Sequence, residues 1–83
     1  MVEEIQETLQ EYYKNIEIEI EFIERNRYKI LLLKKIKKND IIKKSVTFEY
    51  KWNEQNTFYI NIIELENIID RYFKLYLERE VLK

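Results

Sequence analysis

Hydrophobic side chains follow a helical spacing at the start of the chain. Apolar residues stand at Ile5, Leu9, Tyr12 and Tyr13, and the remaining faces carry glutamates at positions 3, 4, 7 and 11. Residues three and four apart share one face of a helix, so residues 2–14 predict an amphipathic helix with a single face to bury.

The period changes to two in the stretch IEIEIEF, residues 16–22. Isoleucine and phenylalanine occupy its even positions, and glutamate occupies its odd positions. Since successive side chains of a strand point to opposite faces, the stretch predicts a strand with an apolar even face and an acidic odd face. Residues 24–26 then predict a turn, in which Asn26 takes the left-handed conformation that glycine would otherwise supply.

Two further strands follow, from Tyr28 to about Lys37 and from Ile42 to Trp52, joined by a turn at residues 38–40. Their even positions are again mostly apolar. One antiparallel register buries all of these apolar side chains on one face. That register pairs Ile36 with Ile42, Leu32 with Val46, Ile30 with Phe48, and Tyr28 with Tyr50.

The last third of the chain predicts a polar loop at 53–56, a short fourth strand at 57–60 and a closing helix. Asn61 is the expected N-cap, with Glu64 reaching back to it as in a capping box. The helix is expected to run to about Val81. Its apolar stripe comprises Leu65, Ile68, Ile69, Tyr72, Phe73 and Tyr76.

This order predicts an α+β fold, an antiparallel meander of three or four strands with an N-terminal and a C-terminal helix. Both helices should pack on the even face, because only that face is continuously apolar and each helix has one stripe to bury. At 83 residues the chain is expected to be one domain, residues 1–83, too small for a deep substrate cavity.

Composition excludes several kinds of chemistry. The chain has no Cys and no His, which removes disulfides, thiolate nucleophiles, imidazole bases and the usual zinc ligands. It also lacks Gly, Pro and Ala, which indicates a natural protein from an AT-rich genome. The acidic start and the absence of a long apolar run predict neither a signal peptide nor a membrane span, so we expect a cytoplasmic protein.

Charge is separated along the chain although the formal net charge is only -1. The net charge is -7 over residues 1–24, +8 over 25–51 and -2 over 52–83. Cross-strand pairs such as Glu21 with Lys29 and Lys29 with Glu49 account for part of this opposition. The remainder favours an oppositely charged partner.

The odd face of the sheet is the predicted protein-binding surface. No helix is left to cover it, and adjacent leucines on an open, charge-flanked face are typical of a protein contact or a homodimer seam. The alternative is that the strand is buried on both faces, or twists so that one leucine lies under a helix end. The predicted contact residues are Leu31, Leu33, Glu17, Glu19, Glu21, Lys35 and Tyr59.

A lysine-rich tip around the second hairpin gives the alternative function, nucleic-acid binding. Its residues are Lys34, Lys35, Lys37, Lys38, Lys43 and Lys44. Such a tip, expected beyond the reach of the helices, can lie along phosphates, touch an acidic protein or stay solvated. It lacks aromatic residues for base stacking and arginines for bidentate base contacts.

The order helix, three strands, helix resembles that of double-stranded RNA-binding domains. Those domains need lysines at the start of the last helix, where this chain has the acidic stretch NIIELENIID. The resemblance therefore covers topology alone, and no family residue is carried over.

Enzyme activity is not expected. Asp40 and the stretch Glu49-Tyr50-Lys51 are similar to the metal-binding pattern of PD-(D/E)xK nucleases, in which two carboxylates hold one divalent ion. Nine residues of extended strand would separate Asp40 from Glu49 by about 30 Å, which is too far. We therefore predict no catalytic, metal or cofactor site.

The sequence favours a small non-enzymatic protein-binding domain. Its size, composition and charge are typical of a phage or mobile-element inhibitor or adaptor that occupies a host protein. An anti-CRISPR or other anti-defence role is the concrete expectation, with a nucleic-acid-binding effector as target. The acidic residues of the first helix and strand would then face a basic groove on that effector.

Overall fold

The fold was analysed in a computed structural model that describes residues 1–36 and 41–77. A helix, three strands and a second helix follow one another in the order predicted. Helix α1 spans Val2–Tyr12, and the strands β1, β2 and β3 span Glu17–Glu24, Arg27–Ile36 and Ile41–Lys51. Helix α2 spans Phe58–Tyr72 and continues as a π-helix, η1, over Phe73–Leu77. The strands form one antiparallel sheet in the order β1-β2-β3, so the fold is α+β.

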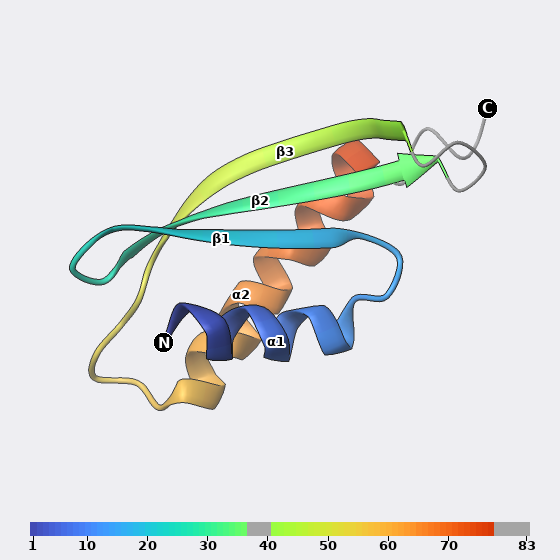
Figure 1. Ribbon diagram of the computed structural model, residues 1–83. Helices are drawn as coiled ribbons and strands as arrows, with labels where there is room; N and C mark the ends of the chain where they lie inside the picture. Colours follow the sequence, from blue (N-terminus) through green and yellow to red (C-terminus); the bar gives the residue numbers. More distant parts are fainter. Residues whose placement is uncertain (37–40, 78–83) are drawn as a thin grey trace.

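Both helices lie on the same side of the sheet, as predicted (Figure 1). Helix α1 runs beneath β1, and α2 crosses toward the far ends of β2 and β3. The core lies between the two layers. It is centred on Ile5 and Leu9 from α1, Ile30 and Leu32 from β2, and Leu65 and Ile69 from α2, all at most 1% exposed.

The predicted register is confirmed over most of the sheet. Tyr28 pairs with Tyr50, Ile30 with Phe48 and Leu32 with Val46. The pairing of Ile36 with Ile42 is wrong, because a register shift between Lys34 and Lys35 pairs Ile36 with Ile41 instead. Such an irregularity moves one strand by a residue relative to its partner, which strict alternation along the sequence cannot reveal.

The first turn is confirmed. An aromatic side chain close to this turn is exposed, although the sequence predicted it to be buried. Asn26 has φ 62°, the left-handed region that asparagine tolerates better than most residues other than glycine. Phe22, predicted to be buried, is 55% exposed. It lies near the tip of the β1–β2 hairpin, and its ring meets that of Tyr28 edge to face at 5.8 Å.

The predicted fourth strand at 57–60 is wrong, because α2 begins there. Thr57 is the N-cap, and its hydroxyl accepts a hydrogen bond from the Ile60 N–H at 3.2 Å. The signal was present in the sequence, since Phe58, Ile62, Leu65 and Ile69 have helical spacing. The strand prediction rested on alternation across only four residues, which is weaker evidence than the longer helical pattern.

Asn61 is therefore not the N-cap but a fully buried residue inside α2. Its Oδ1 accepts from the Asn53 N–H at 3.0 Å and from the Tyr50 hydroxyl at 2.8 Å. Its Nδ2 donates to the carbonyls of Asn53 and Thr57, each at 3.0 Å. The side chain thus uses its whole hydrogen-bonding capacity and holds the loop after β3 against α2.

Replacing Asn61 tests this role. We expect Asn61→Leu to lower the free energy of unfolding by about 3 kcal/mol, because it removes the four hydrogen bonds made by this buried side chain. Urea denaturation measures the loss. Asn67→Leu, at an exposed position of the same helix, should change stability by less than about 0.5 kcal/mol. Equal unfolding midpoints for the two variants would contradict the assignment.

The outer edge of β1 is hydrogen-bonded by two glutamines of α1. Gln10 Oε1 accepts from the Ile18 N–H at 2.9 Å, and Gln6 Oε1 accepts from the Ile20 N–H at 3.3 Å. Gln10 Nε2 also donates to the carbonyls of Tyr13 and Ile16, at 2.8 and 2.7 Å. An otherwise open sheet edge is thereby protected from pairing with another chain.

Candidate protein-binding surface

The predicted leucine contact on the odd sheet face is less accessible than expected. Leu33 is only 8% exposed and Leu31 is half-buried. Both lie on the central strand, opposite Glu17 and Glu19 of β1 and opposite Ser45 and Thr47 of β3. The expectation that two leucines lie open on this face is therefore wrong for Leu33.

The charged residues of that face lie where the register predicted them. Glu21 is opposite Lys29, and their charged groups approach to 3.4 Å. Lys29 is also opposite Glu49, whose carboxylate instead binds Arg27 at 2.8 Å. These exposed pairs contribute little to stability. Glu19 and Glu21 are exposed and Glu17 is half-buried, while the side chain of Lys35 lies outside the described part.

Tyr59 is on a helix and not on the sheet. It lies in the first turn of α2 and is 73% exposed, more than any other large hydrophobic residue whose side chain the structure describes. Ile60 and Ile63 share this outward side and are 49% and 56% exposed. Tyr59 and Ile63 are one turn apart, so the three side chains form a compact patch on the outer face of α2, here called the α2 patch.

The α2 patch follows from where the helix begins. With Thr57 as N-cap, Ile62 and Leu65 are buried, while Tyr59, Ile60 and Ile63 face outward. A signal for the patch is visible in the amino-acid pattern, because α2 has apolar residues at 58–60 and again at 62 and 63, more than one buried stripe requires. A helix whose apolar residues exceed its buried face must expose some of them.

Acidic residues accompany the α2 patch throughout the helical layer. Helix α1 exposes Glu3, Glu4, Glu7 and Glu11, and α2 has no basic residue before Arg71. On α2, burial first and the nearby Asp70 charge second raise the pKa of Glu66. The outer face of the helices is therefore apolar at the patch and negative around it.

The structure places one of the predicted lysines, Lys34, against the helical layer. Lys34 is half-buried, and its Nζ lies 5.6 Å from the centre of the Phe73 ring in η1, a cation–π distance. Lys44 lies opposite Lys34 and is also half-buried. The expectation that the helices end short of this hairpin is therefore wrong at Lys34. Lys37 and Lys38 lie outside the described residues, as do the side chains of Lys35 and Lys43.

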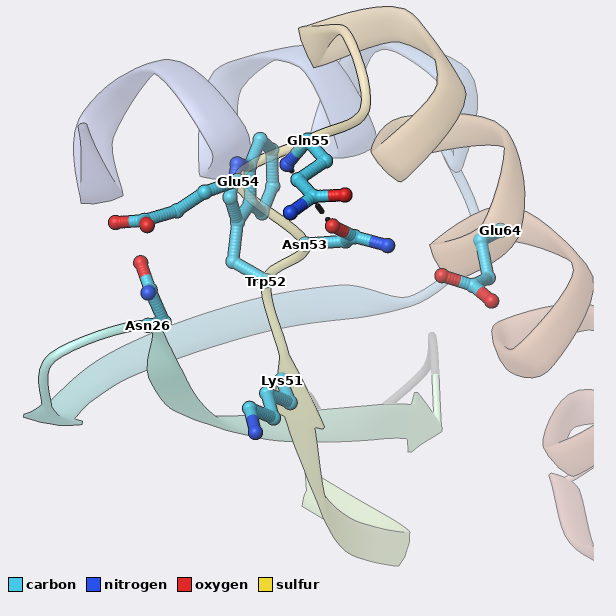
Figure 2. A pocket seen from close by; sticks show the side chains of 7 residues that line it. All are labelled: Asn26, Lys51, Trp52, Asn53, Glu54, Gln55 and Glu64. Carbon is cyan, nitrogen blue, oxygen red and sulfur yellow. Dashed lines mark hydrogen bonds between the residues drawn. The ribbon is translucent and has the colours of Figure 1, made fainter.

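A hollow of about 500 Å³ lies where the loop after β3 meets α2 (Figure 2). Its lining is mostly polar. The Glu54 carboxylate points toward Asn26 and binds Arg25 at 3.3 Å, while Glu64 projects from α2 on the other side of the loop. The lining residues are Asn26, Lys51, Trp52, Asn53, Glu54, Gln55 and Glu64.

The acidic side chains of this hollow are held by hydrogen bonds and an ion pair that anchor the loop after β3. A hydrogen bond from Asn26, followed by the Arg25 charge, lowers the pKa of Glu54, so its carboxyl is charged at neutral pH and does not serve as a general acid. Glu64 is held by the Tyr50 hydroxyl at 2.6 Å. Among residues 1–36 and 41–77, no group of three or more acidic residues is arranged to hold a metal ion. Asp40, the first residue of the nuclease-like pattern, is outside those ranges.

Two buried tyrosine hydroxyls link the helices to the rest of the fold. Tyr13 donates to the Glu66 carbonyl at 3.0 Å and to Asp70 Oδ1 at 2.6 Å, which fastens the end of α1 to α2. Burial first, and then the hydrogen bond to Asp70, raise the pKa of Tyr13. Burial and the hydrogen bond to Glu64 likewise raise the pKa of Tyr50.

These raised pKa values predict a loss of stability at alkaline pH. The neutral hydroxyls favour the folded state below the ordinary tyrosine pKa of about 10, and that contribution is lost as the pH rises beyond it. Tyr13→Phe should therefore cost about 1 kcal/mol at pH 7 and make the decline above pH 10 shallower. Urea denaturation between pH 7 and 11 measures both effects. Tyr59→Phe, at an exposed tyrosine, should keep the original pH profile, and identical profiles for all three proteins would contradict the account.

Comparisons with known proteins found no match for this chain. No protein-family model, no curated protein and no solved structure matches it. In the part of the chain that the structure describes, no helix combines the length and the apolar content needed to cross a bilayer.

Proposed function

We propose that this protein is a non-enzymatic binding domain that docks the outer face of its helices onto a partner protein. The observation that carries the proposal is the α2 patch, in which Tyr59, Ile60 and Ile63 are 73%, 49% and 56% exposed on one side of a helix. A domain this small has few apolar residues to leave outside its core. Exposing three together is typical of an interaction site.

Charge complementarity supports a basic partner. The patch belongs to a helical layer whose exposed charges are almost all negative up to Asp70, so a partner surface with an apolar pocket and a basic rim fits it. Proteins that hold nucleic acid carry such basic surfaces. This agrees with the narrower proposal of a phage or mobile-element inhibitor with an anti-CRISPR or other anti-defence role, which rests on size and composition.

The α2 patch also changes which residues should matter for binding. Tyrosine is enriched among interface residues that dominate affinity, and removing one such side chain costs about 2 kcal/mol or more. Tyr59 stays in the predicted contact set, now as a helix residue, and Ile60 and Ile63 join it. The predicted roles of Leu31, Leu33, Glu17, Glu19, Glu21 and Lys35 stay predictions.

A partner identified by affinity capture, and then purified, gives the test. Isothermal titration calorimetry should show Tyr59→Ala weakening the dissociation constant about 30-fold and Ile63→Lys weakening it further, because each removes a desolvated contact. Raising the salt concentration should weaken binding as well, since the charges around the patch are exposed.

The matched control is Phe22→Lys, at a residue that is 55% exposed, against 56% for Ile63, but that lies near the tip of the β1–β2 hairpin and outside the α2 patch. It should leave the affinity unchanged. The proposal fails if the purified complex tolerates Ile63→Lys and is lost on Phe22→Lys or Leu31→Lys, the second of which would support the sheet face or a homodimer through it.

The nucleic-acid alternative has its own outcome. Labelled duplex and single-stranded DNA and RNA should show no retention at low salt if the lysines serve the fold or a protein partner. Retention that is lost when Lys35, Lys37, Lys38 and Lys43 become Glu would support the alternative. The contact of Lys34 with Phe73 favours a structural role for at least that lysine.

A further inference from the structure

The two outer edges of the sheet are treated differently. The β1 edge is hydrogen-bonded by Gln6 and Gln10 of α1. On β3, between Ser45 and Lys51, no residue of the described ranges hydrogen-bonds to the outer edge. A strand edge with unpaired backbone groups is a template for pairing with another extended chain.

The register identifies which backbone groups of β3 point outward. The Trp52 N–H donates to the Asn26 carbonyl at 2.6 Å, so even-numbered residues of β3 bond inward to β2. In an antiparallel pair the bonding alternates, which leaves the odd residues Thr47 and Glu49 with N–H and C=O directed away from the sheet. The same rule predicts outward N–H groups at Ile18 and Ile20 on β1, where the glutamines bind them.

An apolar hollow of about 400 Å³ lies along this open edge. It touches Phe48, whose side chain points toward the helices, and Glu49, whose side chain points to the opposite face. A hollow that reaches both neighbours must lie at the edge of the strand, and β2 occupies the other edge. The floor is apolar and comes from α2 and η1, with Ile68 half-buried and Leu75 48% exposed. The lining residues are Phe48, Glu49, Ile68, Arg71, Tyr72 and Leu75.

Two basic residues lie along the hollow and the open edge. Arg71 lines the helical side of the hollow, and Lys51, the last residue of β3, lies at one end of the edge. The carboxylate within it, that of Glu49, is already bound by Arg27 at 2.8 Å. Lysines at a strand edge also oppose pairing between two copies of the same chain, because like charges meet across the seam.

We propose that the outer edge of β3 binds an extended segment of a partner protein as a fourth strand. The segment pairs with the outward N–H and C=O groups of Thr47 and Glu49, and its alternate side chains are apolar and acidic. The apolar ones enter the hollow against Ile68 and Leu75 on the helical face, and the acidic ones, on the opposite face, meet Lys51. Backbone bonding then supplies affinity, and alternate side chains supply specificity.

This surface is separate from the α2 patch, and it is tested with a defined probe. A fluorescein-labelled nonapeptide of alternating Val and Glu is titrated to about 1 mM, the weak end of specific recognition, and fluorescence anisotropy follows its binding to the full chain. We expect saturable binding, and amide hydrogen exchange at Thr47 and Glu49 slowed about tenfold or more by the peptide. Exchange at Ile18 and Ile20 should be unchanged.

Two variants locate the binding. Thr47→Pro removes an outward N–H while leaving the ladder to β2 intact, and Leu75→Lys places a charge on the exposed floor of the hollow. Each should weaken binding about tenfold or more, with urea denaturation confirming that Leu75→Lys folds normally. Ile63→Lys, which disrupts the α2 patch, is the matched control and should bind the peptide normally.

The opposing results are equally definite. No binding at 1 mM, binding that survives both Thr47→Pro and Leu75→Lys, or equal binding of a Val/Lys peptide would overturn the proposal. Protection of Thr47 and Glu49 without peptide, together with a dimer in sedimentation, would assign the edge to a second copy of the chain instead. Failure of the α2 patch with retention of peptide binding leaves this proposal standing.

Discussion

The parity of the central strand is the constraint on which the rest of this structure depends. Because β2 is paired on both sides, its even side chains must face the helices and its odd side chains the other surface. The same parity decides which backbone groups of β1 and β3 point out of the sheet. One register thus places the core, the glutamine contacts of the β1 edge and the open groups of β3.

Polar side chains complete what the apolar faces begin. The two helices would cover the sheet through Ile5, Leu9, Leu65 and Ile69 alone, but their positions along it are fixed by directional bonds. Gln10 holds the link between α1 and β1, and Asn61 holds the loop after β3 against α2. Such fully satisfied buried groups favour one arrangement over others that would leave them unpaired.

The two proposed surfaces both follow from the small number of helices and strands. Two helices and three strands leave one helix face and one strand edge without an internal partner, and the chain has no further described element to cover them. The α2 patch is apolar with acidic surroundings, whereas the β3 edge is an apolar hollow with basic surroundings. The opposite charges suit different partners, or two regions of one partner.

Local sequence patterns predicted α1, the three strands and most of their pairing. Period-two alternation placed β1, β2 and β3, and three cross-strand pairs from Tyr28 to Leu32 were confirmed, because alternation fixes which face each residue occupies. Asn26 was predictable because few residues other than glycine adopt a left-handed turn. Strand alternation and turn conformation depend on residues close together in the sequence, so short sequence patterns predict them.

Tertiary structure alone decided the features that depend on distant neighbours. The bulge at Lys34 and Lys35, the burial of Leu33 and the exposure of Phe22 all depart from what strict alternation along the sequence predicts. Asn61 is a core residue because Tyr50 and Asn53, which are 11 and 8 residues away from it in the sequence, both bond to its side chain in the folded protein. The candidate binding surfaces also differ from those predicted, because whether a residue is exposed depends on which other elements of the fold pack over it.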